Sequence, residues 1–191
     1  MTGITAKIIK TQLFKKHYDK NRHVVDSIYF HRFESDFIFV TNTVFINEIE
    51  IKVTKADFYK DFEKGFWRHK KYGYEYARSR IKEPKAKGMY DFIKKHDLLK
   101  AGELGIKGFY FAMPRSVSRQ VEIPEHCGLI TIHEISDTLK PHYRKSDHIK
   151  FNKPIIAPTL PNAVKITEKQ EEQIATSIRW KYINDRKNEN I

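Results

Sequence analysis

The stretch NEIEIKVTKADF (residues 47–58) decides the fold, because its first half alternates charged and apolar residues and its second half resembles the start of a helix. The charged positions are Glu48, Glu50 and Lys52, with isoleucine and valine between them. Successive side chains of a β-strand point to opposite faces, so this pattern predicts a strand with one charged and one apolar face. The charged face is either an ordinary solvent-exposed surface or a site that brings acids and a base together.

The charged strand is the last of three consecutive segments that are predicted to be strands. Residues 24–33, 36–40 and 44–53 are rich in β-branched and aromatic residues, which predicts three extended segments. The turn-prone sequence TNT joins the last two, so residues 36–53 are expected to form an antiparallel hairpin.

Asp36 begins the first strand of this hairpin, which is the partner of the strand with the charged face. Val44 and Ile46 share the parity of Glu48, so the charged face continues an apolar one and should be partly enclosed. Carboxylates on neighbouring strands can hold Mg²⁺ for phosphodiester hydrolysis, and an adjacent lysine can orient or activate the attacking water. A Glu-Ile-Lys tripeptide alone is more often part of a solvated face.

Periodicity along the rest of the chain predicts a mixed α/β class. Thr54 is expected to cap the helix that follows the charged strand. Two short apolar runs, residues 108–113 and 128–133, are typical of buried strands, and the Pro-rich segment beyond residue 139 indicates an irregular arm. Helices are expected at residues 5–20, 54–64, 89–100 and 167–182.

The composition of the 191 residues limits the class of protein. An apolar content of 40% suits one packed domain, and the lone Cys127 excludes an internal disulfide and a multi-cysteine zinc site. The nine histidines show no short paired spacing of a zinc site. The absence of a long apolar run and of a signal-peptide core leads us to expect a cytoplasmic protein with no membrane partner.

The net charge of +12 favours a polyanionic partner, with nucleic acid as the first candidate. Half of that excess lies in residues 65–88, where cations alternate with aromatic residues, a mixture that suits phosphates and stacked bases. The alternative is that the aromatic residues pack on the core while the lysines are merely solvated. The candidate nucleic-acid-binding residues are Lys60, Lys64, Trp67, Arg68, Lys70, Lys71, Tyr74, Arg78 and Arg80.

The pattern of Asp36, thirteen residues, then Glu50-Ile51-Lys52 resembles the signature of the PD-(D/E)XK nuclease superfamily. The continuation EIKVTKADFYKDF, with KGFYFAMP and IPEHCGLITIHE later, is similar to the MmcB-like DNA repair group and related phage-type nuclease domains. The similarity covers about residues 34–134. It departs from the usual pattern at Ser35, where a proline is expected, and in the longer insert at residues 65–107.

The resemblance implies a restriction-endonuclease-like α/β core, with a mixed central sheet of about five strands flanked by helices. It implies Mg²⁺ or Mn²⁺ held by Asp36, Glu50 and the backbone carbonyl of Ile51, with Lys52 as the residue that orients or activates water. Glu34 and Glu48 are auxiliary ligand candidates of lower weight. The core is expected over residues 1–140, with a C-terminal arm and helix over residues 141–191 packed on it.

These expectations leave several alternatives open. The leading hypothesis is a metal-dependent deoxyribonuclease, preferably an endonuclease, in DNA repair or in phage or mobile-element DNA processing. The others are a non-catalytic nucleic-acid-binding accessory protein and a basic protein that binds a partner through its arm. The sequence does not distinguish DNA from RNA, and a homodimer is one expected state. On the helix after the motif, Asp57 and Asp61 are interpreted as members of a surface ion-pair lattice.

Overall fold

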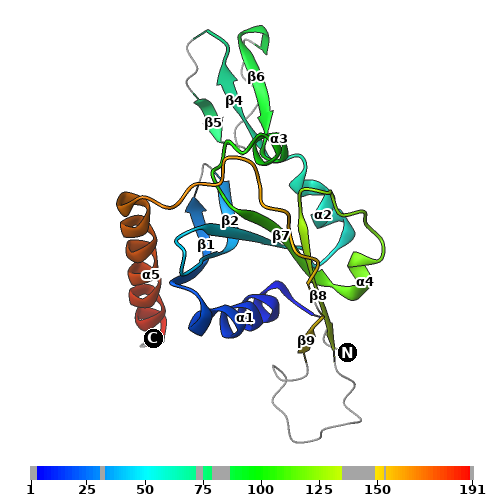
Figure 1. Cartoon of the computed structure of the whole chain (residues 1–191), viewed down its shortest axis with the longest axis vertical. Coiled ribbons are helices and arrows are strands. Elements are labelled where there is room, and N and C mark those ends of the chain that lie inside the picture. The colour runs from blue at the N-terminus through cyan, green and yellow to red at the C-terminus, as the bar shows by residue number, and fades with distance from the viewer. Residues whose placement is uncertain are drawn as a thin grey trace, which may run out of the picture.

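The structure, a computed structural model, describes residues 4–30, 33–71, 75–78, 87–134, 149–152 and 154–189. Its centre is a mixed six-stranded sheet with the strand order β1-β2-β3-β7-β8-β9 (Figure 1). The β3–β7 and β7–β8 pairs are parallel, and the other neighbours are antiparallel. The strands are β1 (His23–Phe30), β2 (Phe33–Val40), β3 (Ile46–Ile51), β7 (Gly108–Pro114), β8 (Gly128–Glu134) and β9 (Ile149–Phe151).

This architecture confirms the α/β class with a mixed sheet flanked by helices, and its hairpin matches the predicted β2–β3 pairing. The sheet has six strands instead of about five, because β9 pairs with β8 in a part of the chain that was expected to be irregular. Hydrogen bonds to the edge of β8 override the weak local propensity of this short segment.

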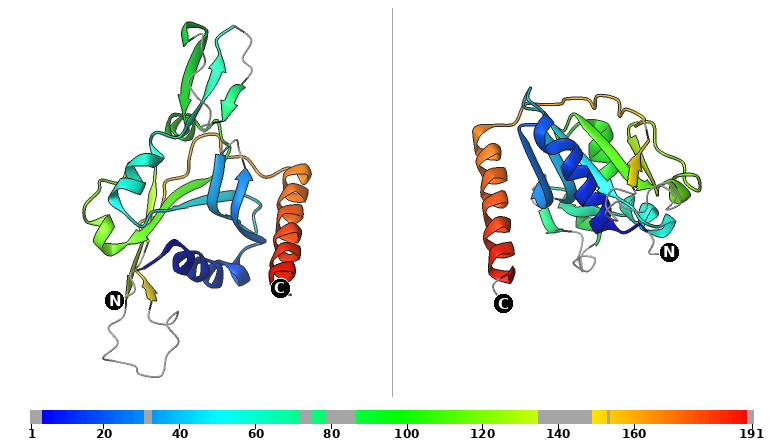
Figure 2. Two further views of the ribbon diagram at one scale, coloured as in Figure 1. Left: turned by 180° about the vertical axis from the view of Figure 1, so that it is seen from behind. Right: turned by 90° about the horizontal axis from the view of Figure 1, so that it is seen from below.

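β3 is buried along its whole length, although two of its six residues are charged. One face of the strand packs through Ile49 and Ile51 against Ile9 and Leu13 of α1 (Ala6–His17). The other face carries the glutamates and is covered by helices from later in the chain (Figure 2). The charged face of the strand is therefore an interior surface and not a solvent-exposed one.

Helix α2 (Lys55–Asp61) follows β3 directly, as predicted. The Thr54 side chain accepts a hydrogen bond from the backbone N–H of Asp57 at 3.1 Å, which satisfies one of the free donors of the first turn. Phe58 and Asp61 are the buried residues of this helix and face the sheet. The cap therefore fixes where Asp61 enters the interior.

The basic insert forms a second, three-stranded sheet with the order β5-β4-β6, which projects from the main body in Figure 1. Its strands are β4 (Gly65–His69), β5 (Glu75–Arg78) and β6 (Tyr90–Lys94). The prediction of one helix over residues 89–100 is wrong in its first half. Pairing of β6 with β4 holds residues 90–94 extended, and helix α3 (Lys95–Ala101) starts only after them.

The remaining helices lie around the edges of the sheet. The final helix, α5 (Glu168–Glu189), confirms the predicted C-terminal helix and packs its buried Ile174 in the core beside β1. Short turns complete the described chain: η1 (Tyr18–Lys20), η2 (Lys87–Met89) and α4 (Arg115–Ser118). Within the described ranges no helix has the length and apolar character needed to cross a membrane.

Replacing Thr54 by alanine is expected to lower the free energy of unfolding by about 1 kcal/mol, because the first turn of α2 loses its side-chain cap. Urea denaturation followed by circular dichroism measures this change. Thr54→Ser keeps the hydroxyl and should stay within about 0.5 kcal/mol of the parent protein. Equal stabilities for Thr54→Ala and Thr54→Ser would show that the cap contributes nothing.

Candidate metal and catalytic site

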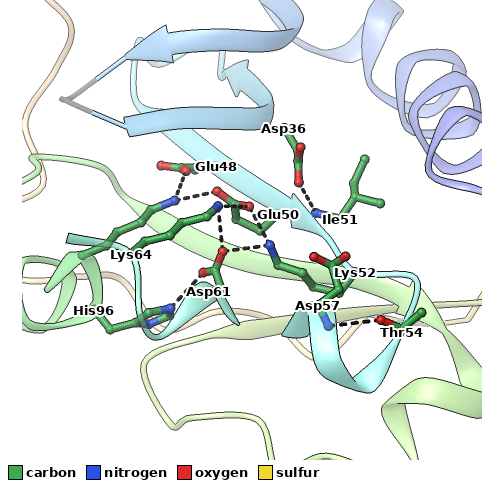
Figure 3. Close-up of polar contacts among 11 residues, drawn as sticks. Asp36, Glu48, Glu50, Ile51, Lys52, Thr54, Asp57, Asp61, Lys64 and His96 are labelled. Carbon is green, nitrogen blue, oxygen red and sulfur yellow. Dashed lines mark hydrogen bonds and ion pairs between the residues drawn. The ribbon is translucent and has the colours of Figure 1, made fainter. Parts of the chain in front are cut away.

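The candidate site lies where β2 and β3 run side by side near the carboxyl end of β3 (Figure 3). β2 and β3 pair from Val40↔Ile46 to Phe37↔Ile49, and Asp36 and Glu50 each lie one residue beyond that last pair. Asp36 Oδ2 accepts a hydrogen bond of 2.9 Å from the backbone N–H of Ile51. The hairpin thus brings together two acids that are separated by thirteen residues in the sequence.

Glu50 is the centre of the site and is fully buried. Its Oε1 accepts from Lys95 Nζ at 2.6 Å, and its Oε2 accepts from Lys52 Nζ at 2.9 Å and from Lys64 Nζ at 2.8 Å. Burial alone would raise the pKa of Glu50, but the three ammonium groups hold this pKa well below its ordinary value. Glu50 is therefore an ionised carboxylate at neutral pH.

Lys52 lies between two buried carboxylates. Its Nζ donates to Glu50 and also to Asp61 Oδ1 at 2.8 Å. Burial opposes its positive charge, but the two neighbouring carboxylates raise the pKa of Lys52 above its ordinary value. The side chain therefore stays protonated and acts as a hydrogen-bond donor whose position is fixed at two points.

Asp61 belongs to this site, so the interpretation of it as part of a surface ion-pair lattice is wrong. It is fully buried, and its Oδ1 also forms an ion pair with Lys64 at 2.8 Å. His96 Nε2 lies 3.0 Å from Asp61 Oδ2. Burial would raise the pKa of Asp61, but the His96 hydrogen bond and the lysine charges lower it well below its ordinary value.

Glu48 occupies the deeper end of the same strand face. Its Oε1 accepts from Lys95 Nζ at 2.7 Å, and the Lys95 side chain is 0% exposed. Burial raises the pKa of Glu48, and the neighbouring Lys95 offsets this only in part. Lys95 thus bridges Glu48 and Glu50, and its ammonium group supplies the positive charge between these two carboxylates. Glu34, the other auxiliary candidate, is exposed on β2.

Asp36 differs from the other acids, because its pKa is raised to about 6. Burial is the main cause, the charge of Glu50 adds to it, and the Ile51 N–H, Lys52 and Lys64 oppose it. A raised carboxyl pKa means that the surroundings carry too little positive charge for the ionised form. A cation bound beside Asp36 and Glu50 would supply that charge.

The numbers of charged side chains at the site also indicate a position for a cation beside Asp36 and Glu50. Four carboxylates, from Asp36, Glu48, Glu50 and Asp61, face three ammonium groups, from Lys52, Lys64 and Lys95. The N–H and C=O of one strand residue face the same neighbouring strand, so the Ile51 carbonyl lies on the side of Asp36. These carboxylate and carbonyl oxygens are the donor atoms that Mg²⁺ and Mn²⁺ prefer.

The predicted nucleic-acid-binding residues fall into separate groups. Lys60 is exposed on α2, whereas Lys64 is part-buried and bound to Glu50 and Asp61. Trp67 of β4 packs on Phe92 of β6, with ring centroids 5.1 Å apart. The structure brings Lys64 to the site and places Trp67 on the projecting sheet.

The other predicted contacts lie along or beside that sheet. Arg68 is 3.6 Å from Glu103, Lys70 is 3.5 Å from Asp91, and Lys71 is exposed. The backbone of Arg78 forms the end of β5, whereas Tyr74 and Arg80 lie outside the described residues. These placements leave the role of the group as a prediction.

Sequence reasoning missed Lys95 and His96 and undervalued Asp61. A signal for Asp61 was present, because it lies three residues after the buried Phe58 on the same face of α2. For Lys95 and His96 no local signal existed. They reach the site only because the pairing of β6 with β4 sets where α3 begins.

Comparisons with known proteins add little to this geometry. No protein-family model matches the chain, and no curated protein matches it significantly. Among solved structures, the chain is similar to a protein of unknown function from Silicibacter pomeroyi, with a TM-score of 0.47 and 11% identity. The match covers 88% of this chain and 82% of that one. Function therefore has to be argued from the site itself.

Replacing Lys95 by methionine is expected to destabilise the fold by about 3–5 kcal/mol, because it leaves two buried carboxylates without their shared cation. Lys94→Met, which changes the exposed neighbour of Lys95, should stay within about 0.5 kcal/mol of the parent. Denaturation in urea measures both variants. A loss for Lys95→Met no larger than that for Lys94→Met would contradict the bridging role.

The same variant should regain stability at lower pH. Glu48 already has a folded-state pKa above its unfolded value, and removal of Lys95 raises it further. A carboxyl with a raised folded-state pKa binds more protons when folded, so its folding penalty shrinks as the pH falls. The difference between Lys95→Met and the parent should be smaller at about pH 5.5 than at about pH 7. Adding Glu48→Gln should remove much of this dependence.

Proposed function

We propose that the protein is a divalent-metal-dependent nuclease that hydrolyses DNA phosphodiester bonds at Asp36, Glu50 and Lys52. The observation that carries the proposal is the geometry at the end of β3. There Asp36, whose pKa is raised, lies beside Glu50, whose pKa is lowered and which accepts a hydrogen bond from Lys52. The resemblance to the PD-(D/E)XK signature supports the same assignment.

Asp36, Glu50 and the Ile51 carbonyl would hold Mg²⁺ or Mn²⁺. The bound ion supplies charge that polarises the phosphoryl oxygen and lowers the pKa of a water. Lys52 has a fixed position relative to both acids, and its raised pKa keeps it protonated at neutral pH. Its proposed role is therefore to donate a hydrogen bond that orients the attacking water or stabilises charge on the phosphate.

Lys64 is suited to contact the scissile phosphate. Its side chain is 31% exposed, whereas those of Lys52 and Lys95 are nearly inaccessible, so Lys64 alone of the three lysines lies at the rim of the site. It reaches Glu50 and Asp61 from this rim. Exchange of one carboxylate contact for a phosphate oxygen would uncover Glu50 for the metal at the moment when substrate binds.

DNA is the preferred substrate because the net charge of +12 attracts a polyanion and the projecting sheet carries cations beside aromatic rings. Exposed Lys70 and Lys71 lie at the end of β4, and Trp67 and Phe92 pack together on the same sheet. Lys60 is exposed on α2, one turn before Lys64. This arrangement suits a backbone that runs from the projecting sheet to the site.

One observation favours a second candidate, a non-catalytic nucleic-acid-binding protein on the same scaffold. Both oxygens of Glu50 are engaged by lysines, so its charge is compensated without a metal. In that case the site would be a structural ion-pair cluster and binding would depend on the basic surface alone. Cleavage assays separate the two candidates.

Glu50→Gln is expected to reduce metal-dependent DNA cleavage by about a hundredfold or more, because the carboxamide cannot supply the charge that the metal and Lys52 require. The rate of plasmid nicking and of single-strand cleavage with Mg²⁺ or Mn²⁺ measures this effect. Glu63→Gln is the matched control, since Glu63 is exposed just beyond α2. It should cleave at the parent rate.

DNA affinity from fluorescence anisotropy accompanies these assays, and circular dichroism verifies the fold. Binding without cleavage by the parent protein under all metal conditions would refute the enzymatic role and leave the accessory role. Equal cleavage by Glu50→Gln and the parent would remove Glu50 from the mechanism.

Metal affinity should depend on the protonation of Asp36. The carboxyl must be ionised to bind a cation, so the affinity for Mn²⁺ should fall about tenfold per pH unit below about pH 6 and level off above it. Calorimetric titrations between about pH 5 and about pH 8 measure this profile. Asp36→Asn should bind the ion weakly and without the step near pH 6. An affinity that does not change across this range would exclude Asp36 as a ligand.

A further inference from the structure

A second cluster of metal-ligating side chains lies directly behind Asp61. It consists of His96 on α3 and of His126 and Cys127 in the segment before β8. His96 Nδ1 is 3.0 Å from His126 Nε2, and the ligand atoms of all three residues lie within 4.8 Å of one another. The cluster therefore offers two nitrogen donors and one sulfur donor to a metal ion.

The chemistry of these donors differs from that of the acidic site. Two imidazoles and a thiolate are borderline-soft ligands that suit Zn²⁺ and are poor ligands for Mg²⁺. In a tetrahedral zinc site with Zn–N distances of about 2.0–2.1 Å, two ligating nitrogens lie about 3.3 Å apart. The observed 3.0 Å between the two histidine nitrogens is close to this separation, so binding would part them slightly and draw the Cys127 sulfur, within 4.8 Å of both, closer to them.

Asp61 orients His96 for this role. The Nε2 atom of His96 lies at hydrogen-bond distance from Asp61 Oδ2, so a proton on Nε2 leaves Nδ1 as a free electron pair that points toward His126. A carboxylate behind a ligating histidine is the usual outer partner in zinc sites. The site therefore has the support that zinc-binding histidines need.

The two other ligands are compatible with a metal. Burial, with the nearby His96 and Lys100, lowers the pKa of His126 to about 4, so its imidazole is neutral and able to bind. Burial and the charge of Asp61 raise the pKa of Cys127 to about 12, so the free thiol is protonated. Formation of a Zn–S bond releases that proton to solvent.

The cluster has an entry path and space for a fourth ligand. His126 lines a pocket of about 790 Å³ that also contacts Tyr59, Lys100, Glu122 and Glu125. None of Asp36, Glu50 and Lys64 lines this pocket, so an ion could reach His126 from it without passing through the acidic site. Catalytic zinc sites commonly keep such an open position for water, whereas closed structural sites do not.

We propose that His96, His126 and Cys127 bind one Zn²⁺ ion, with a fourth coordination position open to water or a carboxylate from the pocket. The ion ties the start of α3 to the segment before β8 and fixes the imidazole that contacts Asp61. The bound ion would thereby stabilise the fold around the lysine cluster. The inference does not rest on the proposed nuclease function.

Cobalt substitution tests the proposal. Co²⁺ added to the metal-free, reduced protein should bind with a stoichiometry of one at this site and give sulfur-to-cobalt charge-transfer absorption in the near ultraviolet. Because Cys127 is the only cysteine in the chain, the band identifies its ligand without ambiguity. Zn²⁺ should displace the cobalt, abolish the band and raise Tm by about 5 °C or more at saturating concentration.

Variants separate this site from the acidic one. Cys127→Ser should lose the charge-transfer band, and His126→Ala, at a part-exposed position, should lose at least tenfold in Zn²⁺ affinity while keeping its circular dichroism spectrum. Asp36→Asn, which changes only the candidate magnesium site, should keep the band. A parent protein without the band, or an affinity unchanged in His126→Ala, would show a hydrogen-bonded histidine pair beside an ordinary buried thiol and overturn the proposal.

Discussion

The fold depends on compensating one buried carboxylate, Glu50. An ionised acid in the interior costs several kcal/mol unless cations and hydrogen bonds replace its water. Three lysines from different parts of the chain do this, one just after β3, one just after α2 and one at the start of α3. The positions of both helices relative to the sheet are thus tied to the charge of a single side chain.

A buried cluster of ion pairs adds little to the free energy of unfolding compared with apolar residues at the same positions. Buried ion pairs are often no more stabilising than well-packed apolar residues of similar volume, because the desolvation of each charge offsets the attraction between them. Here the cost is concentrated at one end of one strand, while the opposite face of β3 packs through isoleucines on α1. That asymmetry favours a chemical reason for the acids over a structural one.

The local elements of this design can be predicted from sequence. Alternation fixes which residues of β3 share a face, a three-residue turn fixes the hairpin, and Thr54 fixes the start of α2. Asp36, Glu50 and Lys52 could be predicted as a group from these short-range rules together with the resemblance to the PD-(D/E)XK signature. Whether they bind a metal remains a prediction.

The contacts between residues far apart in the sequence could not be predicted from local sequence patterns, for a physical reason. The helical spacing of residues 89–94 is real, but pairing with β4 overrides it, and only that pairing places Lys95 beside Glu48. In the same way, His96 and His126 are thirty residues apart and carry no paired zinc spacing, yet they meet at 3.0 Å. Contacts of this kind arise from tertiary packing, which local periodicity does not encode.

The segment between β9 and α5 has a consequence for the order of assembly. The backbone N–H groups of Leu160, Val164 and Ile166 donate to carbonyls of Lys107, Gly105 and Val44, so this late segment closes the end of the sheet where β3 and β7 begin. During synthesis the acids and lysines are made long before this closure is available. The carbonyls of Val44, Gly105 and Lys107 therefore gain these partners only after residues 160–166 have left the ribosome, so this end of the sheet is the last part of the described core to be closed.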